Sequence, residues 1–334
     1  MAAKRFTKGL NGLLFALGVA TAAAGPASAA EKVIYQLGWV PGGSNAIEYL
    51  AVTGGFFAAE GLDVQILSGN GASDTLTKVA AGRADIGAIG IEALMAAEAE
   101  GPVPAKAIFS LYSKKPDSIN TPVDSGITTI ADLAGKRVGT AAYSSSNVVW
   151  PVFAAQNGLD PAKITVTQVD AAALAPLMAS GQVDAIINWI TTAPLDAAVL
   201  EAAGKKMRVI PWSDYGYEGY SQSFVAGEKF LKDRPEVARA FLRAIVKATD
   251  AAIADPMKAA EAIHQLVPEI DAAIAAQEFT ASIPLIRNDV TAADGYGNFT
   301  PARLTTTWTW VAQSRNLKLD AIAPERVVDT SYQR

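Results

Sequence analysis

The chain has 334 residues, a formal net charge of −5 and no cysteine. The absence of cysteine excludes disulfides, thiolate metal sites and a cysteine nucleophile. A moderately acidic chain is a poor partner for nucleic acid or an anionic membrane. Half of the residues are hydrophobic, so the composition favours a folded protein over a disordered one.

The first 29 residues predict a cleaved signal peptide. Lys4, Arg5 and Lys8 form a positive segment, an apolar run covers residues 13–24, and Ala27-Ser28-Ala29 is a small-residue cleavage site. The alternative is a membrane anchor, but the apolar run is shorter than the roughly 20 residues that span a bilayer. We therefore expect a protein exported to the periplasm, with a mature charge of −8 and no lipid anchor.

Short apolar strands then alternate with alanine-rich helices in two series, a pattern typical of mostly parallel α/β lobes. The first series predicts strands at 32–39, 62–67, 85–89 and 105–112, and helices at 45–58, 73–81 and 91–99. The second predicts strands at 136–139, 163–169, 183–187 and 207–211, and helices at 147–157, 171–179 and 191–203.

Two segments are predicted to connect the lobes, residues 115–125 on the way out and 214–221 on the way back. After the return the pattern is helical only, at 233–254, 255–266, 271–282 and 300–314, with Pro235, Pro256 and Pro301 at helix starts. We expect this tail to pack on the first lobe. The first lobe would then comprise 30–117 and 222–334, and the second lobe 118–221.

Several phrases occur in a characteristic order. They are Leu37-Gly38-Trp39-Val40-Pro41, the stretch GGFFAAEGLDV at 54–64, GNGA at 69–72, AGRADIG at 81–87, DLAGKRVG at 132–139 and GQVDA at 181–185. With them the chain resembles the periplasmic substrate-binding proteins of ABC importers, in the group that includes the thiamine-pyrimidine, nitrate, sulfonate and taurine binders. The resemblance implies a two-lobed, type II-like binding-protein fold with a hinged cleft. It also implies a small organic solute and an importer's membrane permease as partners.

Ligands of open α/β sheets lie beyond the carboxyl ends of the strands. This rule selects the loops 39–45, 68–73, 90–92 and 110–114 in the first lobe, and 140–147, 188–192 and Trp212 in the second. From these loops and the return crossing, the predicted ligand-binding residues are Trp39, Pro41, Asn45, Asn70, Gly71, Ala72, Glu92, Tyr112, Ser144, Ser145, Ser146, Asn188, Trp189 and Tyr220.

Each choice has a structural alternative. Trp39 can stack on a flat ligand and face Trp189 across the cleft, or pack under its own loop. The turn 69–73 can present free N–H groups to a ligand oxygen, or simply begin a helix. Glu92 can accept hydrogen bonds from the ligand, or lie solvated at a helix start. Lys114 and Lys115 are expected at the surface.

The residue content disfavours an enzyme. The single histidine, His264, lies in a predicted amphipathic helix, so no Ser-His-Asp or ordinary zinc site is indicated. We expect no cofactor and no metal, and a monomer. Two tryptophans with neutral polar residues favour a heteroaromatic ligand such as a pyrimidine. A small aromatic carboxylate or a taurine-like sulfonate is the second choice. A sensory ligand-binding protein and a pyrimidine-synthesis-like enzyme remain as alternatives of another class.

Overall fold

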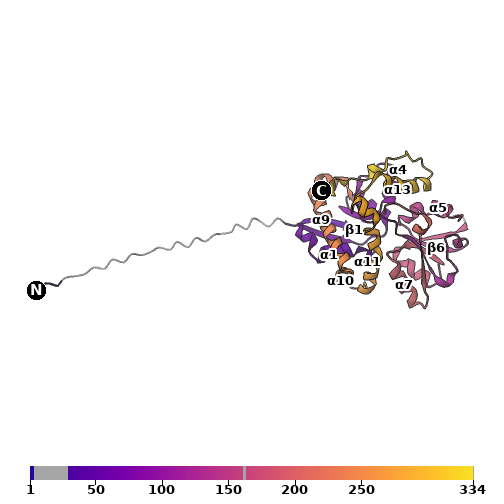
Figure 1. Cartoon of the computed structure of the whole chain (residues 1–334), viewed down its shortest axis with the longest axis horizontal. Helices are drawn as coiled ribbons and strands as arrows, with labels where there is room; N and C mark the ends of the chain where they lie inside the picture. Colours follow the sequence, from indigo (N-terminus) through magenta and orange to yellow (C-terminus); the bar gives the residue numbers. More distant parts are fainter. Residues whose placement is uncertain (4–28, 161–162, 334) are drawn as a thin grey trace.

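The computed structural model describes residues 1–3, 29–160 and 163–333, so residues 4–28 of the predicted signal peptide lie outside the described residues. The described chain forms two five-stranded sheets (Figure 1), with strand orders β2-β1-β3-β10-β4 and β7-β6-β8-β5-β9. The first sheet contains β1 (Glu31–Gln36), β2 (Leu62–Leu67), β3 (Ile86–Gly90), β4 (Ala105–Ser110) and β10 (Gln222–Gly227). The second contains β5 (Asp117–Pro122), β6 (Arg137–Ala141), β7 (Thr165–Val169), β8 (Ala185–Trp189) and β9 (Met207–Pro211).

The two sheets share one plan. In each, four strands run parallel and one runs antiparallel, and the antiparallel strand is the one that the chain forms directly after crossing from the other sheet. Strand β5 pairs antiparallel with β8 and β9, and β10 pairs antiparallel with β3 and β4. The mostly parallel α/β class predicted from the sequence is therefore confirmed. The residue limits predicted for the two lobes stay predictions.

Strand β5 lies within the predicted crossing segment 115–125, and the sequence analysis predicted no strand there. All six of its residues are buried, although its sequence, DSINTP, is polar. The polar groups are paired: Asn120 donates to Asp196 at 2.8 Å, and Thr121 donates to the carbonyl oxygen of Asp184 at 2.8 Å. Because these partners lie in distant segments, no local apolar pattern revealed the strand.

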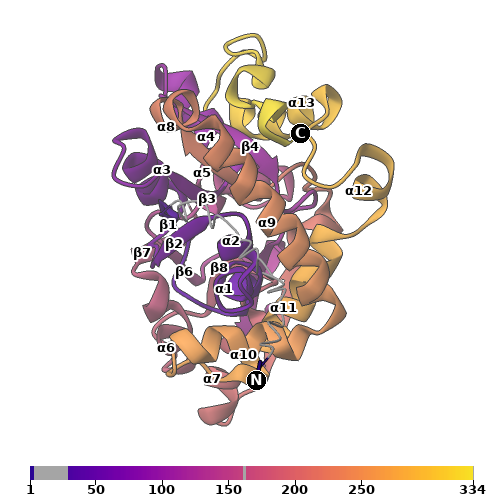
Figure 2. The same cartoon turned by 90° about the vertical axis from the view of Figure 1, so that its left-hand side faces the viewer.

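The helices follow the prediction closely, except that the predicted helix 45–58 is two helices and that α8 and α12 were not predicted. Helices α9 and α10 pack on α1, as Figure 2 shows, while α13 packs on both α4 and α5. Trp310 of α13 lies 5.0 Å from Tyr217, ring centroid to centroid. The helices are α1 (Ala46–Thr53), α2 (Phe56–Ala59), α3 (Ala72–Ala80), α4 (Ile91–Glu100), α5 (Ser146–Gln156), α6 (Leu174–Ala179), α7 (Ala193–Ala202), α8 (Glu228–Asp233), α9 (Pro235–Ala254), α10 (Pro256–Leu266), α11 (Ala272–Ile286), α12 (Asp289–Asp294) and α13 (Pro301–Ser314).

We refer to the first sheet with α1–α4 and α8–α11 as the first lobe, and to the second sheet with α5–α7 as the second lobe. Aromatic side chains fill the centre of the first lobe, where Phe241 of α9 stacks on Phe57 at 5.1 Å and lies 5.5 Å from Tyr35 of β1. Across the described residues, no helix combines the length and the apolar character needed to cross a membrane.

Candidate functional site

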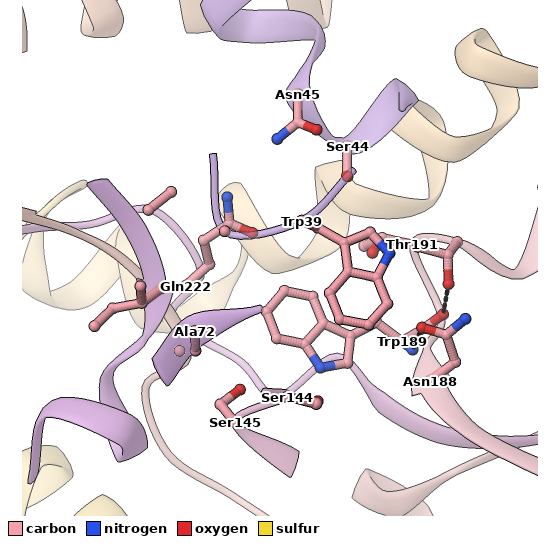
Figure 3. A pocket seen from close by; sticks show the side chains of 15 residues that line it. Trp39, Ser44, Asn45, Ala72, Ser144, Ser145, Asn188, Trp189, Thr191 and Gln222 are labelled. Atoms are coloured by element: carbon pink, nitrogen blue, oxygen red, sulfur yellow. Dashed lines mark hydrogen bonds between the residues drawn. The ribbon is translucent and has the colours of Figure 1, made fainter. Parts of the chain in front are cut away.

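A pocket lies between the two lobes and is lined by segments from both (Figure 3). The first lobe contributes the ends of β1 and β3, the start of α1, the first residue of α3 and the first residue of β10. The second lobe contributes the loop after β6 and the end of β8. The lining residues are Gly38, Trp39, Ser44, Asn45, Ala72, Ala88, Ile89, Gly90, Ser144, Ser145, Asn188, Trp189, Thr191, Thr192 and Gln222.

Two tryptophans reach this pocket from opposite lobes. Trp39 follows β1, and the chain can turn there because Gly38 has no side chain: a Cβ at Gly38 would lie 2.2 Å from the carbonyl oxygen of Ala88. Trp189 is the last residue of β8, and its Nε1 donates to Ser146 Oγ at 3.3 Å. Figure 3 shows both indole rings directed into the pocket. Each lobe thus contributes one indole ring to the lining.

The lining carries no charged side chain, only neutral polar groups and apolar ones. Two of the polar groups are buried and have no hydrogen-bond partner among the described residues: Asn45 Oδ1 and Thr191 Oγ1. Asn45 is 3% exposed and Thr191 is fully buried. Buried polar atoms in native proteins nearly always have a hydrogen-bond partner. These two atoms are therefore available to a molecule in the pocket, one from each lobe.

Asn188, by contrast, is fully engaged by the protein. Its Nδ2 donates to Asp196 Oδ2 at 2.9 Å, and its Oδ1 accepts the backbone N–H of Trp189 at 3.0 Å. Burial raises the pKa of Asp196 to about 7, against the lowering effect of the hydrogen bonds from Asn120 and Asn188. Asp196 thus fixes the amide of Asn188 from behind the pocket wall.

A second buried carboxyl lies behind the opposite wall. Glu278 of α11 accepts the backbone N–H of Gly43 at 2.6 Å, next to the lining residues Ser44 and Asn45. Burial raises the pKa of Glu278 to about 7, and the charge of Asp196 adds to the shift. Helices α11 and α7 pack against each other across the lobes. A buried carboxyl group therefore lies behind each wall of this uncharged pocket.

The lobes touch directly beside the pocket. The backbone N–H of Ser73, in the first turn of α3, donates to the carbonyl oxygen of Tyr143 at 3.2 Å. The N-terminus of α3, which the sequence predicted as a possible site for a ligand oxygen, holds a protein carbonyl instead. Gly71 abuts Tyr143, and Asn70 is exposed to solvent.

Seven of the predicted residues line the pocket, and seven lie outside its lining. The lining set is Trp39, Asn45, Ala72, Ser144, Ser145, Asn188 and Trp189. The other set is Pro41, Asn70, Gly71, Glu92, Tyr112, Ser146 and Tyr220. Among the latter, the Tyr220 hydroxyl accepts the backbone N–H of Thr300 at 2.9 Å and so holds the start of α13. Contact of any of these residues with a ligand stays a prediction.

Glu92 and Lys115 take positions that the sequence did not indicate. Glu92 was predicted either to face the ligand or to lie solvated, and Lys115 was expected at the surface. The two form a buried ion pair, with side chains that are 2% and 1% exposed respectively. The prediction for Lys115 was wrong because it rested on residue type alone, whereas a lysine can be buried when a carboxylate partner is buried beside it.

Four polar lining residues were not chosen individually. Ser44, Thr191 and Thr192 lie inside the loops that the strand-end rule selected, so their location was predicted but not their direction. Gln222 was missed because β10 was not predicted, although the run SFVAG that follows it has strand character. Trp212, also selected by the rule, is instead fully buried on Phe153, with ring centroids 4.3 Å apart. His264 is exposed, and its Nδ1 lies 2.7 Å from the carbonyl oxygen of Ile270.

Comparison with known proteins gives a consistent result. Residues 44–259 match the family model described as NMT1/THI5 like. A 4-amino-5-hydroxymethyl-2-methylpyrimidine phosphate synthase of Saccharomyces cerevisiae is 25% identical over 283 residues, covering 80% of this chain and 82% of its own. A formylaminopyrimidine-binding protein of Halalkalibacterium halodurans is 24% identical over 251 residues, covering 75% of each. The alkanesulfonate-binding protein of Xanthomonas axonopodis pv. citri, solved with MOPS bound, superposes with a TM-score of 0.68 at 17% identity, over 90% of this chain and 98% of that one.

Proposed function

The chain belongs to the NMT1/THI5-like family, and from that premise we propose that it is the solute-binding component of an ABC importer. In this proposal the protein is exported to the periplasm, captures a small organic molecule between its lobes and delivers it to a membrane permease. The two-lobed fold, shared with an alkanesulfonate-binding protein, supports this role. The name of the formylaminopyrimidine-binding relative supports it as well.

One observation carries the proposal for the ligand: an uncharged pocket with a tryptophan from each lobe and two unpaired buried polar atoms, the amide oxygen Asn45 Oδ1 and the hydroxyl Thr191 Oγ1. Aromatic side chains bind flat rings through buried area and through ring contacts worth about 0.5–1.5 kcal/mol beyond it. An unpaired buried amide oxygen selects a ligand with a hydrogen-bond donor, whereas a threonine hydroxyl can donate or accept. We propose a flat, neutral, polar heteroaromatic molecule, of which a pyrimidine is the favoured example.

The side chain of Asn45 narrows the choice of ligand further. Within the described residues no protein group bonds to its Oδ1 or to its Nδ2. A free carboxamide presents one acceptor and one donor side by side, and this edge pairs with an amino group next to a ring nitrogen, as asparagine does with adenine. An aminopyrimidine has such an edge. Thr191, on the other lobe, would then bind a second polar group of the same ligand.

The charges around the pocket argue against the anionic alternatives. No cation is among the lining residues of the pocket, and the carboxyls of Asp196 and Glu278 bond directly to segments of its two walls. A carboxylate or sulfonate would enter without a counter-charge, at a cost that proteins normally avoid. A taurine-like or aromatic acid ligand is therefore not favoured by the geometry.

Binding is also favoured over catalysis. The yeast relative is named as a synthase, so a catalytic role is the competing function. The lining of this pocket, however, contains neither histidine nor an ionisable nucleophile, and His264 lies exposed in α10, outside the lining. A pocket of this kind can hold and orient a ligand but offers no group for general acid–base work.

The test is a binding screen with matched variants. Thermal shift and calorimetry would be run with aminopyrimidines, a flavin, benzoate and taurine. We expect an aminopyrimidine to bind, and Trp39→Ala and Trp189→Ala each to weaken its binding about ten-fold or more. Trp310→Phe, in α13 outside the pocket, serves as the control and should bind normally. Binding of benzoate or taurine alone, or unchanged affinity in both alanine variants, would overturn the proposal.

A further inference from the structure

A buried cluster of charges lies where the chain crosses between the lobes. Glu92, in the first turn of α4, pairs with Lys115, which lies two residues before β5. The Tyr217 hydroxyl donates to Glu92 Oε1 at 3.2 Å, and Lys115 Nζ lies 4.8 Å above the Tyr217 ring. One carboxylate, one ammonium and one tyrosine from three segments are thus packed together.

Asp117 connects this cluster to the pocket wall. It is the first residue of β5, is 2% exposed and lies directly opposite Trp189 in the antiparallel pair with β8. Ser146 Oγ donates to Asp117 Oδ1 at 2.5 Å, and Trp189 Nε1 donates to the same Ser146 oxygen at 3.3 Å. A continuous chain of hydrogen bonds therefore runs from a buried carboxylate to the indole that faces the ligand space.

A serine hydroxyl has a single proton, and the direction of that proton decides which neighbours the oxygen can accept from. While Asp117 accepts a hydrogen bond from the Ser146 hydroxyl, the lone pairs of Ser146 Oγ remain available to accept the indole N–H of Trp189. We propose that Asp117 and Ser146 are positioning residues for Trp189: through the Ser146 hydroxyl, Asp117 sets the orientation of one aromatic wall of the pocket. This inference rests on the proposed function in so far as Trp189 is taken as a ligand contact.

The charges that face Asp117 predict when this orientation holds. They are Glu92 from α4 and Lys115 from the crossing; the phenol of Tyr217, from the return segment, also faces Asp117 and is uncharged. Burial and, to a lesser degree, the charge of Glu92 raise the pKa of Asp117 to about 6, while Lys115 and the hydrogen bond from Ser146 oppose the shift. Above that pH the carboxylate accepts from Ser146. Below it the protonated carboxyl can donate to Ser146 Oγ, and the oxygen becomes a poorer acceptor for the indole.

The test needs no ligand. In the intact mature protein, the indole ¹⁵N–¹H resonance of Trp189, assigned by its loss in Trp189→Phe, should shift with pH around a midpoint near 6. Ser146→Ala should abolish this titration, since it removes the link while leaving Asp117 in place. Asp117→Asn should abolish it too. The control is Ser180→Ala, an exposed serine of the second lobe that donates to Leu177, and it should titrate like the wild type.

Persistence of the Trp189 titration in Ser146→Ala, or no titration in the wild type, would overturn the inference. A second measurement uses whichever aminopyrimidine binds in the screen. Ser146→Ala should weaken its binding about three- to ten-fold at pH 7.5 and reduce the change in affinity between pH 5 and 7.5, leaving the part that is due to Asp196 and Glu278. A purely structural role would lower affinity equally at both values. If no ligand binds but the resonance titrates as described, the proposed function fails and the positioning role stands.

Discussion

The backbone N–H of Ser73 and the carbonyl oxygen of Tyr143 are 3.2 Å apart, and this hydrogen bond joins the first turn of α3 to the loop after β6. It connects one lobe to the other at the rim of the pocket. Gly71 makes the approach possible, since a Cβ there would lie 2.6 Å from the carbonyl carbon of Tyr143. Gly71 also has a φ of 134°, in a region that favours glycine. The contact is what we expect of a closed cleft.

Gly71→Val should therefore hinder closure. The added side chain would collide with the Tyr143 backbone and strain the turn, so the lobes would separate in solution. We expect a larger radius of gyration by X-ray scattering and at least ten-fold weaker ligand binding. Gly82→Val is the matched control, because Gly82 also has a positive φ but a Cβ there meets no atom within 4 Å. If both variants weakened binding equally, the loss of affinity would be due to backbone strain alone.

Asn45→Ala should separate binding from stability. The Asn45 Oδ1 atom is buried without a partner, so its removal relieves an unmet hydrogen bond in the empty protein. We expect the free energy of unfolding to stay within about 0.5 kcal/mol of the wild type or to rise. Ligand affinity should fall about ten-fold, as for a lost hydrogen bond of roughly 1.4 kcal/mol. A large loss of stability with full affinity, from urea unfolding and calorimetry, would contradict this role.

Stability should fall as the pH rises from 5 to 8. Burial raises the pKa values of Glu48, Asp196 and Glu278 to about 7 each, so the folded protein holds protons that the unfolded chain releases near pH 4. Their contribution is fully present below the unfolded pKa and is lost as the pH rises through about 7. We expect a decrease of about 1 kcal/mol or more per group in urea unfolding. Asp196→Asn should flatten the slope, and a rising slope in the wild type would refute the prediction.

Trp212→Ala should destabilise the fold without altering the ligand site. Trp212 is fully buried and stacked on Phe153 at an interplanar angle of 11°. Replacement of a buried tryptophan by alanine typically costs about 3–5 kcal/mol. Thermal unfolding should report that loss, while ligand affinity below the transition should match the wild type. Weakened binding with unchanged stability would instead place Trp212 at the ligand.

The local pattern of the sequence determined much of this architecture. Strand β2 was predicted with its observed limits, Leu62–Leu67, because apolar residues alternate there with polar ones between glycine-containing turns. The alternation of strands and helices gave the α/β class, and the strand-end rule located the loops that line the pocket. Periodicity and turn residues are properties of neighbouring positions, so a single chain displays them without its partners.

Only the tertiary structure decided the features that depend on distant partners. Strand β5 is polar and yet buried between β8 and β9, because its polar groups have distant partners: Asn120 bonds to Asp196, 76 residues away. Lys115 is buried because Glu92 is buried against it. Of the tryptophans that follow strands, Trp39 and Trp189 face the pocket while Trp212 stacks in the core. Residue type sets what a side chain can do, but the direction in which it points depends on which distant segment packs beside it.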